Sequence, residues 1–216
     1  MYNDSELQKA VQAELGWEPS VIAAHIGVAA KEGVVTLTGH VENYAGKYAA
    51  EKAARRVKGV KAVAEEIEVK LLYDTKRSDE DIAAAAIDRL AWDVSIPRDA
   101  IQVKVEKGWV SLTGQVDWHY QRDAAQQDVR RLYGVIGVSN QIAIKPKVNV
   151  LNLSDDITHA LHRSWAFDPK TINVSAEAGM VRLTGTARSP HDRRTAAMTA
   201  WSAPGVTGVE NDITLN

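Results

Sequence analysis

One six-residue block occurs three times in this chain, and it constrains the fold more than any other feature. The block is VVTLTG at residues 34–39, WVSLTG at 109–114 and MVRLTG at 180–185. Its last glycine recurs after 75 residues (39 to 114) and then after 71 (114 to 185). Because similarity at a nearly fixed period is the signature of a repeated structural unit, we expect one unit in triplicate.

The repetition extends on both sides of the block. A glycine directly precedes each copy, and a Gly-Val pair follows at the same offsets, at 59–60, 134–135 and 205–206. The matches span nearly all of the 216 residues, which predicts three domains: 1–72, 78–146 and 153–216. A domain of this size buries only roughly 60% of its unfolded surface, so each core is expected to be marginal alone.

Composition excludes several classes of protein. The formal net charge is −2, which argues against a general nucleic-acid binder. Cysteine is absent, so neither a disulfide framework nor thiol chemistry is available. The first residues carry no basic and apolar signal-peptide pattern, and no later stretch is long enough to span a bilayer. The expected location is therefore the cytoplasm, or the periplasm if a signal peptide has been removed.

Each unit begins with a predicted amphipathic helix. Good N-cap residues stand at its start in every copy: Asn3 or Asp4, then Ser78, then Ser154. Apolar residues follow at helical spacing, as Ile82, Ala86 and Leu90 in the second copy and as Ile157, Leu161 and Trp165 in the third. Trp165 lies two residues nearer its strand than Trp17 and Trp92 do, which suggests that the third copy has lost two residues there.

Two strands, a second helix and a third strand complete the unit. The strands alternate apolar and polar residues, and short glycine turns join the first two into an antiparallel hairpin. The second helix, starting near Glu42, Asp117 or Ser189, returns the chain so that strands two and three run parallel. The fold class is α+β: three tandem α-β-β-α-β modules, each a three-stranded mixed sheet covered on one face by two helices.

Six recurring glycines are interpreted as structural. Gly39, Gly114 and Gly185 stand at inward-facing positions of the second strand, where a close helix-two contact is the preferred explanation over approach of a ligand. The other three, which follow the second helix, are expected to end it: Gly59, Gly134 and Gly205.

The unit resembles the BON (bacterial OsmY and nodulation) domain. The resemblance rests on the strand ending Leu-Thr-Gly and on the signature Gly-Val-x-x-Val-x-Asn-x-Ile, present as GVIGVSNQI at 134–142 and GVTGVENDI at 205–213. The first copy departs from it with Ala62 for the second glycine and Glu65 for the asparagine. The resemblance implies a non-enzymatic stress or envelope protein of bacteria. Relatives are associated with osmotic shock, phospholipid binding, transport-associated secretin and channel assemblies, and potassium binding.

Basic residues recur on the predicted second helix of every copy. The binding candidates are Lys52, Arg55, Arg56, Arg130, Arg131, Arg193 and Arg194. They fit a surface for phosphate headgroups, where each basic residue contributes on the order of 1 kcal/mol. The alternative, which we prefer, is a solvated face that pairs locally with Glu51, Asp123 and Asp128.

A tryptophan near the end of the first helix also recurs, as Trp17, Trp92 and Trp165. Tryptophan suits a membrane interface, and a lipid site on the BON domain is associated with this helix, so these residues join the lipid-binding candidates. Core or inter-domain packing is the preferred explanation of the repeated aromatic residue.

No catalytic constellation or cofactor motif recurs in the three copies. His159 and His162 have a metal-compatible spacing, but no third ligand is apparent and the other copies lack the pair. We therefore expect no enzyme activity, no cofactor and no metal.

The leading hypothesis is a non-enzymatic stress or envelope-associated protein whose modules engage anionic phospholipid or membrane surfaces. The alternatives are a cytoplasmic sensor of a small ion, potassium above all, and a scaffold for a protein partner. Neither a nucleic-acid partner nor a transmembrane segment is expected.

Overall fold

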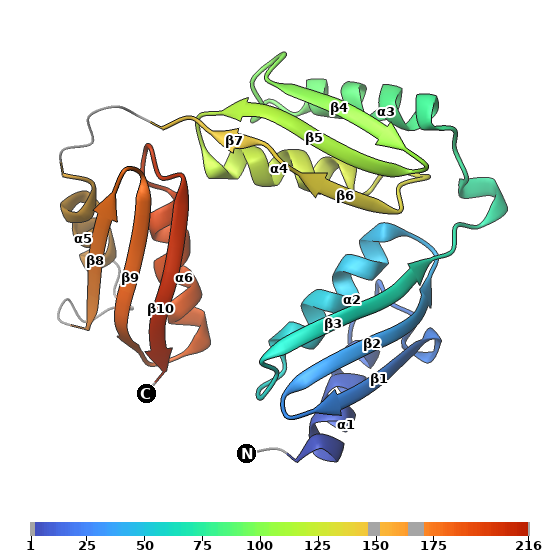
Figure 1. Ribbon diagram of the computed structural model, residues 1–216, viewed down its shortest axis with the longest axis horizontal. Coiled ribbons are helices and arrows are strands. Elements are labelled where there is room, and N and C mark those ends of the chain that lie inside the picture. Colours follow the sequence, from blue (N-terminus) through green and yellow to red (C-terminus); the bar gives the residue numbers. More distant parts are fainter. Residues whose placement is uncertain (1–2, 147–151, 164–170, 216) are drawn as a thin grey trace. The chain divides into compact units, whose positions relative to one another are not determined.

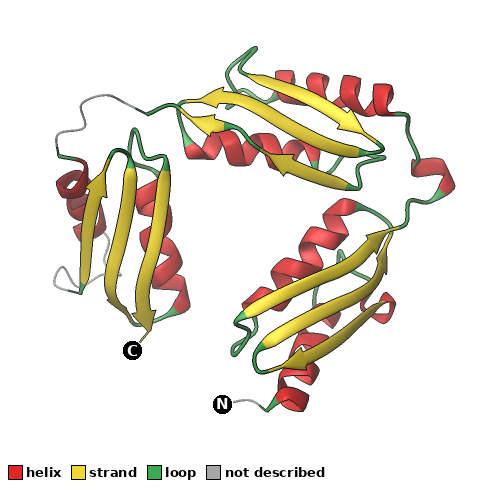
Figure 2. Ribbon diagram, in the orientation of Figure 1, coloured by secondary structure: helices red, strands yellow, loops and turns green. Residues whose placement is uncertain are grey.

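The computed structural model of the protein describes residues 3–146, 152–163 and 171–215. Each predicted unit contains its own mixed sheet, with two helices on one face of it (Figures 1 and 2). The expected α+β class and the three tandem α-β-β-α-β modules are confirmed.

In module one, the sheet order is β1-β2-β3. β1 and β2 pair antiparallel, with Ile26 opposite Gly39, and β2 and β3 pair parallel, with Val34 opposite Ala62. The elements in chain order are α1 (Asp4–Gly16), the 3-10 turn η1 (Ala23–His25), β1 (Ile26–Lys31), β2 (Val34–Val41), α2 (Tyr44–Arg56) and β3 (Ala62–Val69).

Module two repeats this order, but its last strand is interrupted. β4 and β5 run antiparallel, and β6 and β7 follow each other along the other side of β5 (Figure 1). The elements are η2 (Tyr73–Thr75), α3 (Asp79–Trp92), β4 (Ile101–Glu106), β5 (Trp109–Val116), α4 (His119–Val129), β6 (Gly137–Asn140) and β7 (Ala143–Ile144).

Module three has the sheet order β10-β9-β8. The antiparallel pair is β8 with β9, and the parallel pair is β9 with β10, where Met180 lies opposite Gly208. The elements are α5 (Leu153–His162), β8 (Ile172–Glu177), β9 (Met180–Ala187), α6 (Pro190–Trp201) and β10 (Gly208–Leu215).

The core of each module forms where helix spacing and strand alternation point to the same layer. Three residues of the first helix, four apart, are at most 7% exposed in every module: Leu7, Val11 and Leu15; Ile82, Ala86 and Leu90; Leu153, Ile157 and Leu161. They pack over alternate residues of the central strand, such as Val35 and Leu37, which are fully buried. Apolar residues four apart on the helix and two apart on the strand therefore face each other and produce a two-layer module.

These buried positions correct the alignment of the third copy. Leu15, Leu90 and Leu161 recur at offsets of 75 and 71, the same as the strand glycines, so no residues are lost between helix and strand. The third-copy equivalent of Trp17 is Arg163, and each of these two residues is the C-cap of its helix. The predicted cap Ser154 is also wrong, because α5 begins at Leu153 with Asn152 as its N-cap.

The second-strand glycines owe their identity to the backbone and not to helix two. Gly39, Gly114 and Gly185 have φ angles of 109°, 130° and 121°, which side chains disfavour. A Cβ at Gly39 would overlap the carbonyl oxygen of His25, just before β1. The residue after Gly185 also donates its N–H to the equivalent carbonyl, that of Thr171, at 2.9 Å. The atoms nearest to such a Cβ thus belong to the main chain at the start of the first strand and not to helix two, so the predicted close helix contact is wrong.

The later glycines lie in the turns that lead into the third strand. Gly59, Gly134 and Gly205 have positive φ angles of 98°, 85° and 82°. The preceding helices end three to five residues earlier, at Arg56, Val129 and Trp201, so these glycines do not themselves end the helices as expected.

A side-chain link joins helix two to strand three, and it explains the departure at Glu65. In modules two and three, Asn140 and Asn211 donate to main-chain carbonyl oxygens of the second helix, each at 2.9 Å. In module one the Lys47 ammonium instead lies 2.9 Å from Glu65 and donates to the carbonyl oxygen of Ile67 at 2.7 Å. An ion pair thus replaces an amide at the same place in the fold.

Candidate functional site

The tryptophans at the end of the first helix are exposed wherever the structure describes them. Trp17 caps α1 and is 84% exposed, and Trp92 ends α3 and is 85% exposed. Trp165 lies outside the described residues. The preferred interpretation of Trp17 and Trp92 as core residues is therefore wrong.

Helix geometry gives the reason for their exposure. Each tryptophan follows the last buried residue of its helix, Leu15 or Leu90, by two positions. Two residues rotate an α-helix by about 200°, which places the indole on the side away from the sheet. Exposed apolar residues follow in the adjoining loops, with Ile22 50% exposed and Val94 fully exposed.

The loop that carries Trp17 is fixed by polar contacts. The main-chain N–H of Trp17 donates to the Glu14 carbonyl oxygen at 3.2 Å, and the Ser20 hydroxyl donates to the Glu18 carboxylate at 2.7 Å. The Ser20 hydrogen bond is the main reason that the pKa of Glu18 lies below its usual value. Arg56 lies 2.9 Å from Glu14 and 3.6 Å from Glu18. The indole is thus presented by an ordered helix end.

The basic candidates of module one make local ion pairs. Arg55 pairs with Glu51 one helical turn away at 2.7 Å, and Arg56 joins α2 to α1 through Glu14. Lys52 is exposed and forms no ion pair with a described residue. Two of the three side chains therefore have the charge partners that local pairing requires.

The basic candidates of the other two modules are placed differently. The predicted placement of Arg130 and Arg131 on the second helix is wrong, because α4 ends at Val129 and both residues lie in the turn that follows it. Arg193 donates to the carbonyl oxygen of Asn211 at 3.1 Å, and Arg194 donates to that of Pro190 at 3.4 Å. No ion pair among the described residues uses these four side chains. The basic candidates thus belong to three different modules.

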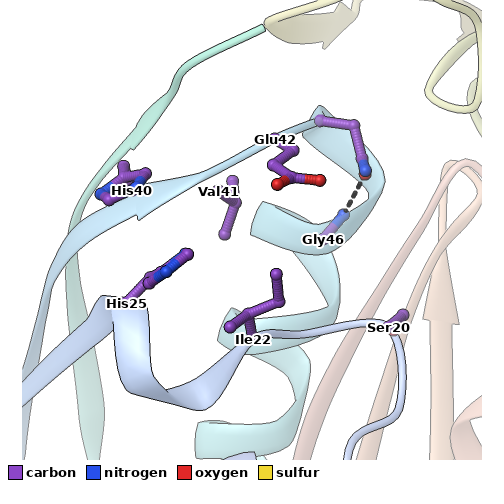
Figure 3. Close-up of a pocket in the computed structure, with 8 residues that line it drawn as sticks. Ser20, Ile22, His25, His40, Val41, Glu42 and Gly46 are labelled. Carbon is purple, nitrogen blue, oxygen red and sulfur yellow. Dashed lines mark hydrogen bonds between the residues drawn. The ribbon is translucent and has the colours of Figure 1, made fainter. Parts of the chain in front are cut away.

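Module one contains a small depression that sequence reasoning missed. The imidazole rings of His25 and His40 stack there, with centroids 4.7 Å apart and planes 17° apart. Figure 3 shows the two rings beside Ile22, near the start of α2, where Asn43 accepts the Gly46 N–H at 2.8 Å. The sequence could have indicated this pair only through the register of the hairpin, which brings together two histidines that lie 15 residues apart.

The histidine pair does not amount to a metal site. Within the described residues, no three His, Cys, Asp or Glu side chains are grouped so that they could hold a metal ion. The equivalent positions in the other modules are Ala100 with Gln115 and Thr171 with Thr186, so the pair is particular to module one.

The comparisons with known proteins agree with the repeat. A family model described as the BON domain matches three times, at residues 3–70, 78–146 and 149–216. The chain belongs to the BON family. Escherichia coli K12 osmotically-inducible protein Y, a relative of this BON chain, is 29% identical over 150 residues, or 66% of this chain and 73% of that protein.

Two solved structures of CdsD, a structural protein of the type III secretion system of Chlamydia trachomatis, also match this BON protein in the structural comparison. They are 17% identical and cover 100% and 96% of this chain and 100% and 91% of theirs. Their TM-scores are 0.27 and 0.26, too low to support a conclusion about function. Among the described residues, no helix is long and apolar enough to cross a bilayer.

Proposed function

We propose that this BON protein is a non-enzymatic osmotic-stress protein that binds anionic phospholipid surfaces through the exposed tryptophans of its first helices. The observation that carries the proposal is the exposure of Trp17 and Trp92, at equivalent positions of two modules, to 84% and 85%. A large aromatic side chain that is kept in solvent twice at one position favours an interaction surface. The link to osmotic stress rests on the relationship to osmotically-inducible protein Y.

Tryptophan suits the interface of a bilayer because its ring is apolar while its N–H remains near water. An aromatic side chain buries on the order of 150–250 Å². At about 25 cal/mol per Å², complete transfer of one such ring would contribute up to roughly 4–6 kcal/mol. Two or more rings on one chain add avidity, since the second attachment is intramolecular.

The basic residues have a smaller role in this proposal. Arg55 and Arg56 are paired with Glu51 and Glu14, so their charges are largely compensated. Lys52 and Arg131 are exposed and are the better contacts for lipid phosphates. Each basic residue contributes only on the order of 1 kcal/mol, and the net charge is −2. Removing the tryptophans should therefore weaken binding more than raising the salt concentration does.

Vesicle co-sedimentation tests the proposal. The full chain is mixed with vesicles of phosphatidylglycerol and phosphatidylcholine, and with vesicles of phosphatidylcholine alone. We expect binding to the anionic vesicles and at least a tenfold weaker binding by the W17A/W92A variant, equivalent to about 1.4 kcal/mol. The matched control is W109M, which removes a tryptophan from a sheet face and should bind like the unmodified chain.

Two results would overturn the proposal: absence of binding to anionic vesicles at low salt, or equal binding by W17A/W92A and the unmodified chain. The potassium alternative would use main-chain carbonyl groups and is tested separately. Different melting temperatures in potassium and sodium at equal ionic strength, without vesicle binding, would favour that alternative.

A further inference from the structure

The central strand of module two begins with a tryptophan on the sheet face that the helices leave uncovered. In β5, Val110 and Leu112 are fully buried beneath the helices, so the alternate residues Trp109 and Ser111 lie on the opposite face. Trp109 is 47% exposed. This aromatic residue is distinct from Trp17 and Trp92, which lie at helix ends.

The Trp109 ring is held flat against the neighbouring strand. A Cβ built at Gly137 of β6 would overlap Cε3 and Cζ3 of the indole, so the six-membered ring lies directly over the Gly137 backbone. The indole Nε1–H donates to the Ser139 hydroxyl at 2.9 Å. One face of the ring thus covers the strand and the other faces solvent, in an orientation fixed before any ligand arrives.

The groups around this ring are polar, and few of them are charged: Lys107, in the turn before β5, is exposed and forms no ion pair with a described residue. The Ser139 hydroxyl, which accepts from the indole, still has a proton to donate. Ser111 lies two residues along β5 from this tryptophan, on the same face of the sheet. Lys104, on β4 of the same sheet, lies 3.1 Å from Glu106, so its charge is compensated. The surface therefore offers one aromatic face with hydroxyl groups next to it.

The other modules do not reproduce this arrangement. Module three has Met180 over Gly208, with Arg182 paired to Asp212 at 2.7 Å further along the sheet. Module one has Val34 opposite Ala62. Methionine or valine is enough to cover the third strand in the other modules. Covering the strand therefore does not explain why module two has a flat indole there.

We propose that Trp109 is the stacking platform of a binding site for a neutral sugar ring of an oligosaccharide. The C–H bonds on one face of a pyranose carry partial positive charge and match the negative face of the indole. The sugar hydroxyls can exchange hydrogen bonds with Ser111 and Ser139. A nucleic acid fits less well, because its phosphates require several free basic residues and Lys107 alone would supply one charge.

The experiment is a titration of the full chain, labelled with nitrogen-15, with three soluble sugars: cellotetraose, maltotetraose and tetra-N-acetylchitotetraose. The indole N–H signal of Trp109 is followed by NMR. We expect at least one sugar to shift this signal at millimolar concentration, while the indole signal of Trp17 stays unchanged.

Variants taken from the other modules keep the fold and remove the platform. Trp109→Met installs the residue that module three places over its glycine, and it should abolish sugar binding, read by calorimetry. Gly137→Ala uses the residue that module one has at this point, and it should lift the ring and weaken binding several-fold. Trp109→Phe keeps a flat ring without the N–H and should retain part of the affinity. Unchanged amide spectra outside the sheet confirm folding.

Absence of a Trp109 response to all three sugars would overturn the inference. Equal sugar binding by W109M and the unmodified chain would do the same, as would a Trp109 response to oligothymidylate alone. The result is independent of the membrane proposal, because W17A/W92A should lose vesicle binding and keep the sugar response.

Discussion

Replacing Gly39 by alanine should strongly destabilise module one, whereas the same change at Gly16 should not. Gly39 has a φ of 109°, and a Cβ there would overlap the His25 carbonyl oxygen. Gly16 ends α1, has no positive φ, and would have no atom within 4 Å of its Cβ. The two substitutions add the same methyl group to the same module, so their difference isolates the effect of the positive φ and of the close His25 carbonyl at Gly39.

The expected magnitudes follow from this geometry. A residue held in a sparsely populated backbone region costs about 1–3 kcal/mol. Relief of the overlap requires β1 to move from β2, which weakens a main-chain hydrogen bond worth about 1 kcal/mol. Gly39→Ala should therefore lower the free energy of unfolding of module one by about 2–4 kcal/mol. Gly16→Ala should raise it by about 0.5–1 kcal/mol, because helical glycine is entropically costly.

Hydrogen exchange with mass spectrometry on the full chain can measure both effects within module one. Exchange in peptides from β1 and β2 should accelerate by roughly 30- to 1,000-fold in Gly39→Ala, at about 1.4 kcal/mol per tenfold. In Gly16→Ala, the same peptides should exchange at the same rate as in the unmodified chain or more slowly. If Gly39→Ala exchanged like Gly16→Ala, the backbone conformation and close main-chain contact at Gly39 would be refuted as the reason for the repeated glycine.

Two further predictions concern links between elements. Lys47→Met should destabilise module one by about 1–2 kcal/mol, because Glu65 loses the ammonium 2.9 Å away. In thermal unfolding, K47R/E65N should recover this stability, because modules two and three have arginine and asparagine at these two positions. The pKa of Asp81 lies below its ordinary 3.8, chiefly because the Ser78 hydroxyl donates to it at 2.7 Å. Its contribution to the cap of α3 should therefore be complete above pH 3.8 and be lost as pH falls through the lowered pKa. In Ser78→Ala, a carbon-13 titration should show the pKa of Asp81 rising; an unchanged value would contradict this cause.

The repeat made the architecture predictable because local and tertiary signals agree in it. Alternation in residues such as Val35 and Leu37, helical spacing in Ile82 and Ala86, and the glycine turns all specify the same two-layer module. The lengths of the connections then allow only an antiparallel hairpin followed by a parallel crossover.

The features that escaped prediction depend on small rotations and on register. Whether Trp17 is buried depends on its two-residue step from Leu15, about 200° around the helix, and repetition of an aromatic residue does not reveal that angle. A helix contact is the natural prediction for the glycine of the second strand, because the sequence does not show that the His25 carbonyl lies against it. The meeting of His25 with His40 likewise required the hairpin register.

The glycine signature of the third strand shows how repeats can report on packing. Gly137 and Gly208 lie beneath Trp109 and Met180, while Ala62 lies opposite the smaller Val34. The residue on one strand thus varies with the one across from it, and the departure of the first copy from the family signature has a steric explanation.

The most direct test of the central claim is to ask which indoles touch a lipid surface. The chain, labelled with nitrogen-15, is mixed with anionic bicelles that contain a lipid spin-labelled at its headgroup, and the indole N–H signals are compared by NMR. We predict that the signals of Trp17 and Trp92 lose intensity first, while that of Trp109 is retained. Uniform loss across all indoles, or no loss at Trp17 and Trp92, would contradict the claim that these exposed helix ends bind the membrane.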